Sequence, residues 1–166
     1  TEAGDVQVMS AGTGVMHSEY NLEDEQTRLF QIWIEPRAAG GKPHWDAKAF
    51  PKGDRANQLE ILASGFDRDI DNGALMIGAD ARFYGASLTQ GTTIGHEVAA
   101  GAHIYLVGSA GQISSSLSKP GNRDTSTPKE QRRMSRRCSL FTPKSKRMEN
   151  ENGKNTGIIL LFLRSC

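Results

Sequence analysis

Residues 4–20 read GDVQVMSAGTGVMHSEY and predict two strands joined by a tight turn. Val6 and Val8 alternate with polar residues on the first predicted strand, and Gly12 marks the turn. A second apolar run begins directly after the turn and ends at a histidine and a glutamate. This stretch therefore places possible metal-binding chemistry at the end of a strand.

The second predicted strand ends in His17-Ser18-Glu19. Successive strand side chains point to opposite faces, so His17 and Glu19 would share one face. A neutral imidazole and a carboxylate are ligands that suit iron, nickel, manganese or zinc. The same spacing also occurs in ordinary surface ion pairs, and spacing alone leaves both interpretations open.

Residues 4–21, together with residues 29–34 and Pro36, resemble the pirin family. Pirins are bicupins, with two β-barrel domains in one chain. The N-terminal cupin of that family binds a metal, usually iron, through a His-x-His pair on an earlier strand and the His and Glu of this motif. The resemblance thus implies His17 and Glu19 as two metal ligands of four, because no histidine precedes His17.

The resemblance implies an all-β cupin fold, which is a double-stranded β-helix or jelly-roll barrel. The chain is expected to be a fragment that lacks the first part of the N-terminal cupin. The expected parts are the closing strands of the N-terminal cupin (1–36), a linker (37–50), the C-terminal cupin (51–118) and a basic atypical tail (119–166) with a last strand near 157–163.

Hydrophobic alternation predicts the individual strands. Residues 29–34 should pair with the strand that carries His17 and bury Trp33 in the core. In the second barrel, turns are expected at residues 71–73 and 90–91 because both contain glycine. The strands expected there are 58–63, 74–77, 81–88, 92–98 and 103–108.

Three further histidines were weighed as ligands. His44 lies near a proline, in a segment expected to cross between the barrels with Trp45 and Phe50 packed on an interdomain surface. His96 and His103 lie on different predicted strands and form no His-x-His pair. Ordinary polar roles are favoured for all three, and the resemblance agrees, since the C-terminal cupin of pirins generally lacks metal ligands.

Charge is distributed unevenly along the 166 residues, although the net charge is only +1. Residues 1–118 carry 8 Lys and Arg against 15 Asp and Glu, whereas residues 119–166 carry 12 against 4. The cluster at 132–137 is typical of a nucleic-acid or nuclear-import patch, but no aromatic residues accompany it, so nucleic-acid binding is not favoured. The abrupt change also fits an out-of-frame or otherwise aberrant C-terminus.

The remaining composition argues for a reducing cytoplasm and against membrane association. Cys138 and Cys166 form neither a metal-binding spacing nor a disulfide framework. The longest apolar run, residues 157–163, is much shorter than the roughly 20 residues that span a bilayer.

The resemblance implies oxidative ring cleavage of a flavonol such as quercetin, with Fe(II) or another divalent transition metal. Glu19 would be a ligand and the base that takes the flavonol proton, and His17 a ligand only. One alternative is a non-catalytic, iron-dependent regulator of the transcription-cofactor type. A third interpretation is a truncated, impaired chain that binds little iron tightly and associates with itself through open strand edges.

Overall fold

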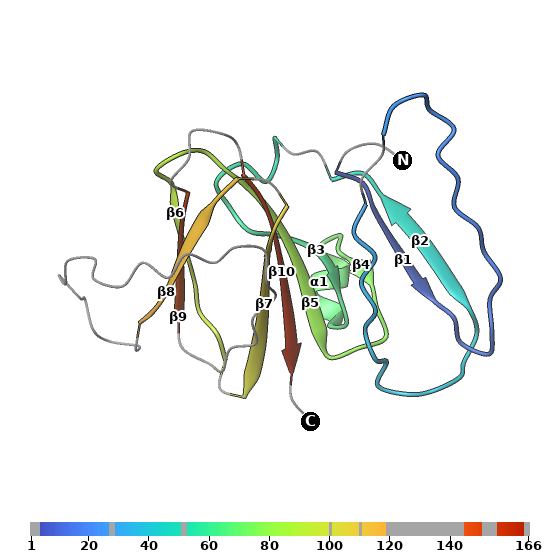
Figure 1. Ribbon diagram of the computed structural model, residues 1–166. Helices are drawn as coiled ribbons and strands as arrows, with labels where there is room; N and C mark the ends of the chain where they lie inside the picture. The colour runs from blue at the N-terminus through green and yellow to red at the C-terminus, as the bar shows by residue number, and fades with distance from the viewer. Residues whose placement is uncertain are drawn as a thin grey trace.

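The structure is a computed structural model that describes residues 4–26, 29–50, 53–99, 101–109, 111–118, 145–150 and 156–164 (Figure 1). In chain order the elements are β1 (Val6–Ser10), β2 (His44–Lys48), β3 (Glu60–Ser64), α1 (Asp67–Asp71), β4 (Leu75–Met76), β5 (Ala81–Leu88), β6 (Thr93–His96), β7 (Ala102–Gly108), β8 (Ile113–Ser118), β9 (Ser145–Asn150) and β10 (Thr156–Arg164). The prediction of an all-β fold is confirmed. Within the described ranges, no helix combines the length and apolarity needed to cross a membrane.

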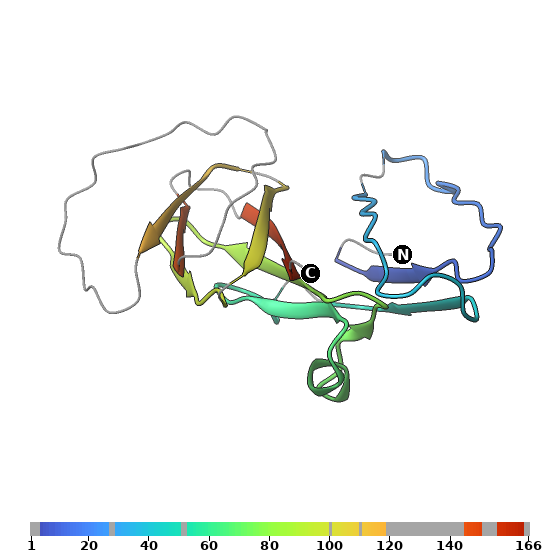
Figure 2. The same ribbon diagram turned by 90° about the horizontal axis from the view of Figure 1, so that it is seen from below.

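Two sheets form the larger part of the molecule. One has the strand order β4-β3-β5-β10-β7 and the other the order β6-β9-β8 (Figures 1 and 2). The apolar strand β10 lies between β5 and β7 and is antiparallel to both, so it joins segments that are distant in the sequence. Strand β9 joins β6 and β8 in the same way.

An apolar cluster lies between these two sheets. Tyr84, Ala86 and Leu88 occupy alternate positions of β5 and therefore point to the same face. They pack with Ile104 of β7, and partly buried residues of β6 and β8 complete the cluster. Burial of this shared apolar face stabilises the sandwich.

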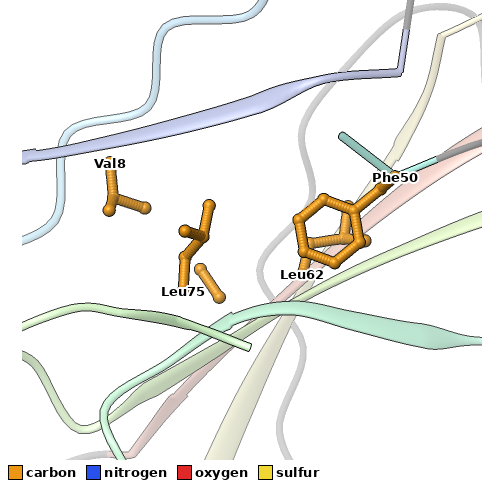
Figure 3. Close-up of a cluster of buried hydrophobic side chains, with 5 residues drawn as sticks. Val8, Phe50, Leu62 and Leu75 are labelled. Atoms are coloured by element: carbon orange, nitrogen blue, oxygen red, sulfur yellow. The ribbon is translucent and has the colours of Figure 1, made fainter. Parts of the chain in front are cut away.

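A second apolar cluster lies on the other face of the five-stranded sheet, where the pair β1–β2 packs. Val8 of β1 meets Leu62 and Leu75 there, and Phe50 covers one side (Figure 3). Lys48 of β2 also donates a hydrogen bond of 2.5 Å to the carbonyl of Gly73, just after α1. The pair β1–β2 is thus attached to the five-stranded sheet through buried apolar side chains.

A β-bulge in β3 places two consecutive side chains in the second apolar cluster. The register between β3 and β5 shifts between Ile61 and Ala63, so Leu62 is the extra residue. Ile61 packs against the first cluster, whereas the consecutive residues Leu62 and Ala63 are both buried in the second. A regular strand would have sent these two neighbours to opposite faces.

Several predicted strands of the second barrel are confirmed. Strand β5 has the predicted limits, and β3, β4, β6 and β7 agree within a few residues. The turns at Gly73 and Gly91 have the expected positive φ, 96° and 77°. Strand β10 covers the apolar run that was expected to form the last strand.

The strands predicted over residues 15–20 and 29–34 are wrong, because neither segment is in a strand. Trp33 is 87% exposed, so the prediction that it packs in a core is also wrong. Trp45 is 58% exposed on β2, whereas Phe50 is buried as expected. Val8 of β1 is buried, with 7% of its surface exposed.

Candidate metal-binding segment

The predicted ligands lie in the connection between β1 and β2, residues 11–43. This connection runs outside the five-stranded and the three-stranded sheet (Figure 2). His17 and Glu19 are both exposed. Neither side chain is therefore enclosed in a barrel interior. Their role as metal ligands stays a prediction.

The connection has few backbone contacts that could hold it as a strand. The Gly14 amide donates to the Ala11 carbonyl at 2.8 Å and closes the predicted turn. The Thr13 amide donates to the Gly41 carbonyl at 2.9 Å, which brings the two ends of the connection together. Between these ends, the described residues form no ladder, and a strand without a partner leaves its amides and carbonyls to water.

His17 and Glu19 supply suitable donor types but do not complete a metal site. Among the residues that the structure describes, no three His, Cys, Asp or Glu side chains are grouped so that they could hold an ion. Two exposed donors fall short of the four ligands expected from the resemblance. The residues present thus do not fit a closed metal centre.

The other histidines are placed apart from this segment. His44 begins β2, His96 ends β6 and His103 lies in β7. The Nε2 atom of His44 and the Nδ1 atom of His103 are buried and have no hydrogen-bond partner in the described ranges. None of the three belongs to a metal-binding group in the described part of the chain, and ligation by them stays unsupported.

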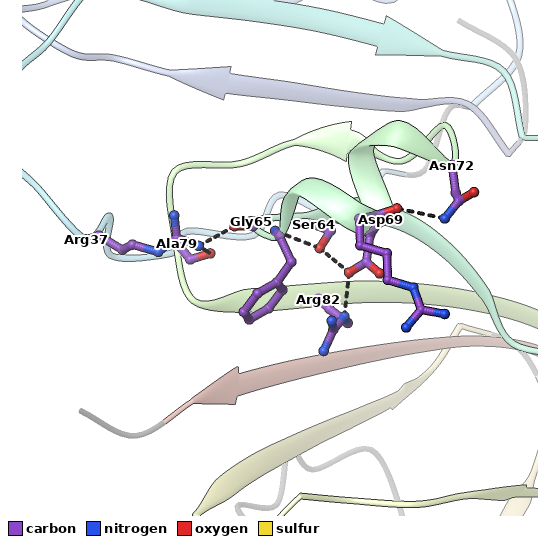
Figure 4. Close-up of polar contacts among 9 residues, drawn as sticks. Arg37, Ser64, Gly65, Asp69, Asn72, Ala79 and Arg82 are labelled. Atoms are coloured by element: carbon purple, nitrogen blue, oxygen red, sulfur yellow. Dashed lines mark hydrogen bonds and ion pairs between the residues drawn. The ribbon is translucent and has the colours of Figure 1, made fainter.

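Arg37 attaches the connection to the five-stranded unit (Figure 4). Its backbone amide donates to the Gly78 carbonyl at 2.8 Å. Its side chain donates to the Gly65 carbonyl, to the Ala79 carbonyl at 3.3 Å and to Asp80 Oδ1 at 2.6 Å. Arg37 therefore satisfies carbonyls of two loops at once and fixes one end of the segment that carries His17 and Glu19.

A buried carboxylate lies beside this anchor. Asp69 of α1 accepts hydrogen bonds from Ser64 at 2.6 Å and from the Nε of Arg82 at 2.5 Å (Figure 4). Burial by itself raises the pKa of Asp69, but the hydrogen bonds from Ser64 and Arg82 and the charges of Arg82 and Arg68 outweigh it and lower the pKa. Asp69 is thus held ionised as a structural group.

His96 contacts the first apolar cluster through Tyr84. Their rings form an edge-to-face pair with centroids 5.2 Å apart. Burial and the nearby charge of Arg82 lower the pKa of His96, while Glu97 opposes the shift. Burial raises the pKa of Tyr84, and the charge of Arg82 acts against that. Both rings are therefore neutral parts of the core at neutral pH.

Arg37, Ser64 and Asp69 were not predicted from the sequence. Their partners lie 2 to 43 positions away in the chain, and no periodic pattern marks them. A possible signal was the short polar helix around Asp69, which no strand pattern covers. The contacts themselves became visible only with the fold.

Comparison with known families places this architecture in a defined class. The family model described as "Quercetinase C-terminal cupin domain" matches residues 61–137, so the second unit is a cupin. The model described as "Pirin" matches residues 1–34, which include His17 and Glu19. The chain belongs to the pirin family.

Individual relatives agree with that assignment. A "Pirin-like protein" of Caulobacter vibrioides is 55% identical over 113 residues, which cover 68% of this chain and 48% of the relative. A "Quercetin 2,3-dioxygenase" of Escherichia coli is 34% identical over 105 residues, which cover 63% and 43%. The chain spans about half the length of the curated relatives it matches.

Solved structures share the fold. The bacterial pirin YhhW of Escherichia coli, in complex with nickel(II), superposes with a TM-score of 0.64 at 20% sequence identity. The match covers 99% of this chain and 63% of that one. A second structure of the same protein gives a TM-score of 0.63 at 22% identity. The predicted cupin fold is confirmed.

Proposed function

We propose that this chain is part of a pirin-type metalloprotein in which His17 and Glu19 are two ligands of a divalent transition metal. The observation that carries the proposal is the His-x-Glu pair inside the segment that the Pirin model matches. The two donor types suit iron and nickel. Two further donors would have to join them, since the described residues do not supply a complete set.

The proposed reaction is oxidative ring cleavage of a flavonol of the quercetin type. Support comes from the relatives that are named quercetin 2,3-dioxygenase. The metal would supply the oxygen chemistry when bound. Glu19 would accept the proton of the flavonol hydroxyl, a role that a carboxylate within hydrogen-bond reach of the substrate can perform.

The metal part of the proposal is tested by titrating the chain with Ni²⁺ and Fe²⁺ under anaerobic conditions and following the His17 ring by NMR. Selective shifts at His17 that vanish in Glu19→Gln and persist in Glu23→Gln support the pair as ligands. Glu23 is a matched control because it is an exposed carboxylate of the same connection. Equal shifts in both variants would contradict the assignment. With two donors the affinity should be low.

The reaction is tested by oxygen consumption with quercetin after metal loading. Turnover that His17→Ala abolishes supports the dioxygenase. Metal binding without turnover favours a regulator instead.

A regulatory function has one supporting observation. Met16, Leu22 and Trp33 are 99%, 92% and 87% exposed in the same connection as the proposed ligands. Large exposed apolar side chains near one another along a chain are typical of surfaces that contact other proteins. We propose self-association through this connection as the simplest form of such contact, and sedimentation over a range of concentrations tests it.

A further inference from the structure

Arg55 is held against β5, the central strand of the five-stranded sheet. Its carbonyl accepts the Ser87 amide at 3.0 Å, and the Asn57 amide donates to the Ser87 carbonyl at 2.8 Å. The residue between them, Ala56, forms a parallel bridge with Ser87. Because the backbone on both sides is bonded to β5, the position of the Arg55 side chain is defined by the sheet.

The Arg55 side chain lies over Gly85, where β5 has no side chain. A Cβ built on Gly85 would be 2.8 Å from Nη1 and 3.5 Å from Cδ of Arg55. The same Cβ would be 2.7 Å from Cδ1 of Leu62. Glycine at position 85 thus leaves the space that the guanidinium group occupies, next to the buried wall made by Leu62.

This guanidinium is buried without a counter-charge. Arg55 is only 9% exposed, and its Nε is buried with no hydrogen-bond partner among the described residues. Its side chain forms no ion pair or hydrogen bond with any residue that the structure describes. Glu60, which is opposite Gly85 in the register of β3 and β5, is exposed and does not pair with it. Arg37 and Arg82, by contrast, are each paired with an aspartate.

An arginine stays charged in proteins, so the cost of burying it must be offset by an anion or by hydrogen bonds. Burial lowers the pKa of Arg55. A planar guanidinium offers several N–H donors that match the two oxygens of a carboxylate or phosphate. The missing partner is therefore expected to be an oxyanion.

We propose that the Arg55 guanidinium, which occupies the space over Gly85, is a binding site for a small oxyanion, a carboxylate or a phosphate. The anion would approach the outer end of the guanidinium, at the part of the residue that solvent reaches, since Nε is enclosed. The site is distinct from the connection that carries His17 and Glu19, and it does not depend on the proposed metal or reaction.

The test is a titration of the unmodified chain, labelled with ¹⁵N, with acetate and with inorganic phosphate at constant ionic strength. The Arg55 Nε–H resonance should shift in a saturable manner, while sodium chloride at the same ionic strength should leave it in place. Saturation by acetate alone assigns the site to carboxylates, and saturation by phosphate alone assigns it to phosphates. A response to neither, or an equal response to chloride, would overturn the site.

Variants then locate the binding. Arg55→Gln removes the charge, and Gly85→Ala places a Cβ 2.8 Å from Nη1 and so displaces the guanidinium. Each should weaken binding by at least about tenfold, the effect of losing a charge-assisted hydrogen bond. Arg68→Gln is the matched control, because Arg68 is an exposed arginine on α1, and its affinity should equal that of the unmodified chain. Loss of binding in Arg68→Gln to the same degree would contradict the assignment. The wild-type titration decides the matter even where a variant fails to fold.

Discussion

Ser64 donates its hydroxyl hydrogen to Oδ2 of Asp69 at 2.6 Å, which joins the end of β3 to α1 inside the protein. Ser64 is fully buried and also accepts the Phe66 amide at 3.1 Å. The same oxygen of Asp69 accepts Arg82 of β5, whose guanidinium lies 4.2 Å from the centre of the Phe66 ring. One carboxylate thus holds the short helix against two strands.

Replacing Asp69 with asparagine should lower the free energy of unfolding by about 1–2 kcal/mol, because the neutral amide loses the charged hydrogen bond to a partly exposed Arg82. Urea denaturation measures the change. Asp71→Asn is the matched control on the same helix, since Asp71 is exposed, and it should change stability by less than about 0.5 kcal/mol. Equal losses in both variants would contradict a specific role for Asp69.

The pH dependence of that loss has a definite sign. The pKa of Asp69 is lowered in the folded chain, so its contribution is present above the ordinary carboxyl pKa of about 3.9 and is lost as the pH falls through the lower folded value. The difference between the wild type and Asp69→Asn should therefore shrink as the pH falls below about 4. A difference that stays constant over this range would refute the ionised state.

The sequence predicted the second barrel far better than the first strands. Apolar residues of β5 alternate toward one face, where they pack with Ile104 of β7. Because the structure buries the face that the pattern marks, the limits of β5 were predicted correctly. Residues 15–20 also carry a strand pattern, but a strand needs a neighbour, and the described residues offer none there. β2 was missed because its pairing with β1 involves residues that are about 40 positions away. β8 and β9 were missed because serine and charged residues favour strands weakly.

Protonation of His96 should destabilise the folded chain. Burial and Arg82 lower its pKa, so as the pH falls below the ordinary histidine value of about 6.5 the unfolded chain binds a proton that the folded chain resists. The free energy of unfolding should fall by up to about 1.4 kcal/mol per pH unit in that range from this group. Urea midpoints between pH 8 and pH 5.5 measure it.

His96→Gln should flatten the dependence, because glutamine does not titrate. Glu97→Gln should extend it to lower pH, because Glu97 supplies the charge that opposes the shift. The assignment to His96 would be refuted by a profile that both replacements leave unchanged.

Gly65→Ala should disturb the attachment of Arg37. A Cβ at this position would lie 1.8 Å from the Ala79 carbonyl oxygen and 2.7 Å from Nη2 of Arg37, so the two loops must separate. We expect a loss of about 1–3 kcal/mol in the free energy of unfolding and faster hydrogen exchange at the Arg37 amide. Gly95→Ala in β6 is the control, since a Cβ there meets nothing within 4 Å and Gly95 has no part in the attachment. Similar exchange rates in the two variants would contradict the attachment.

Leu62 tests whether the pair β1–β2 belongs to the same cooperative unit as the five-stranded sheet. Leu62 is 2% exposed and packs with Val8 of β1 across the second apolar cluster. Leu62→Ala should create a cavity and cost about 2–5 kcal/mol, whereas Leu22→Ala, at a position that is 92% exposed, should cost less than about 0.5 kcal/mol. Hydrogen exchange at the Val8 amide should accelerate along with that of β3 in Leu62→Ala. If β3 is destabilised and the Val8 amide keeps its protection, the first strands are held by contacts other than this core.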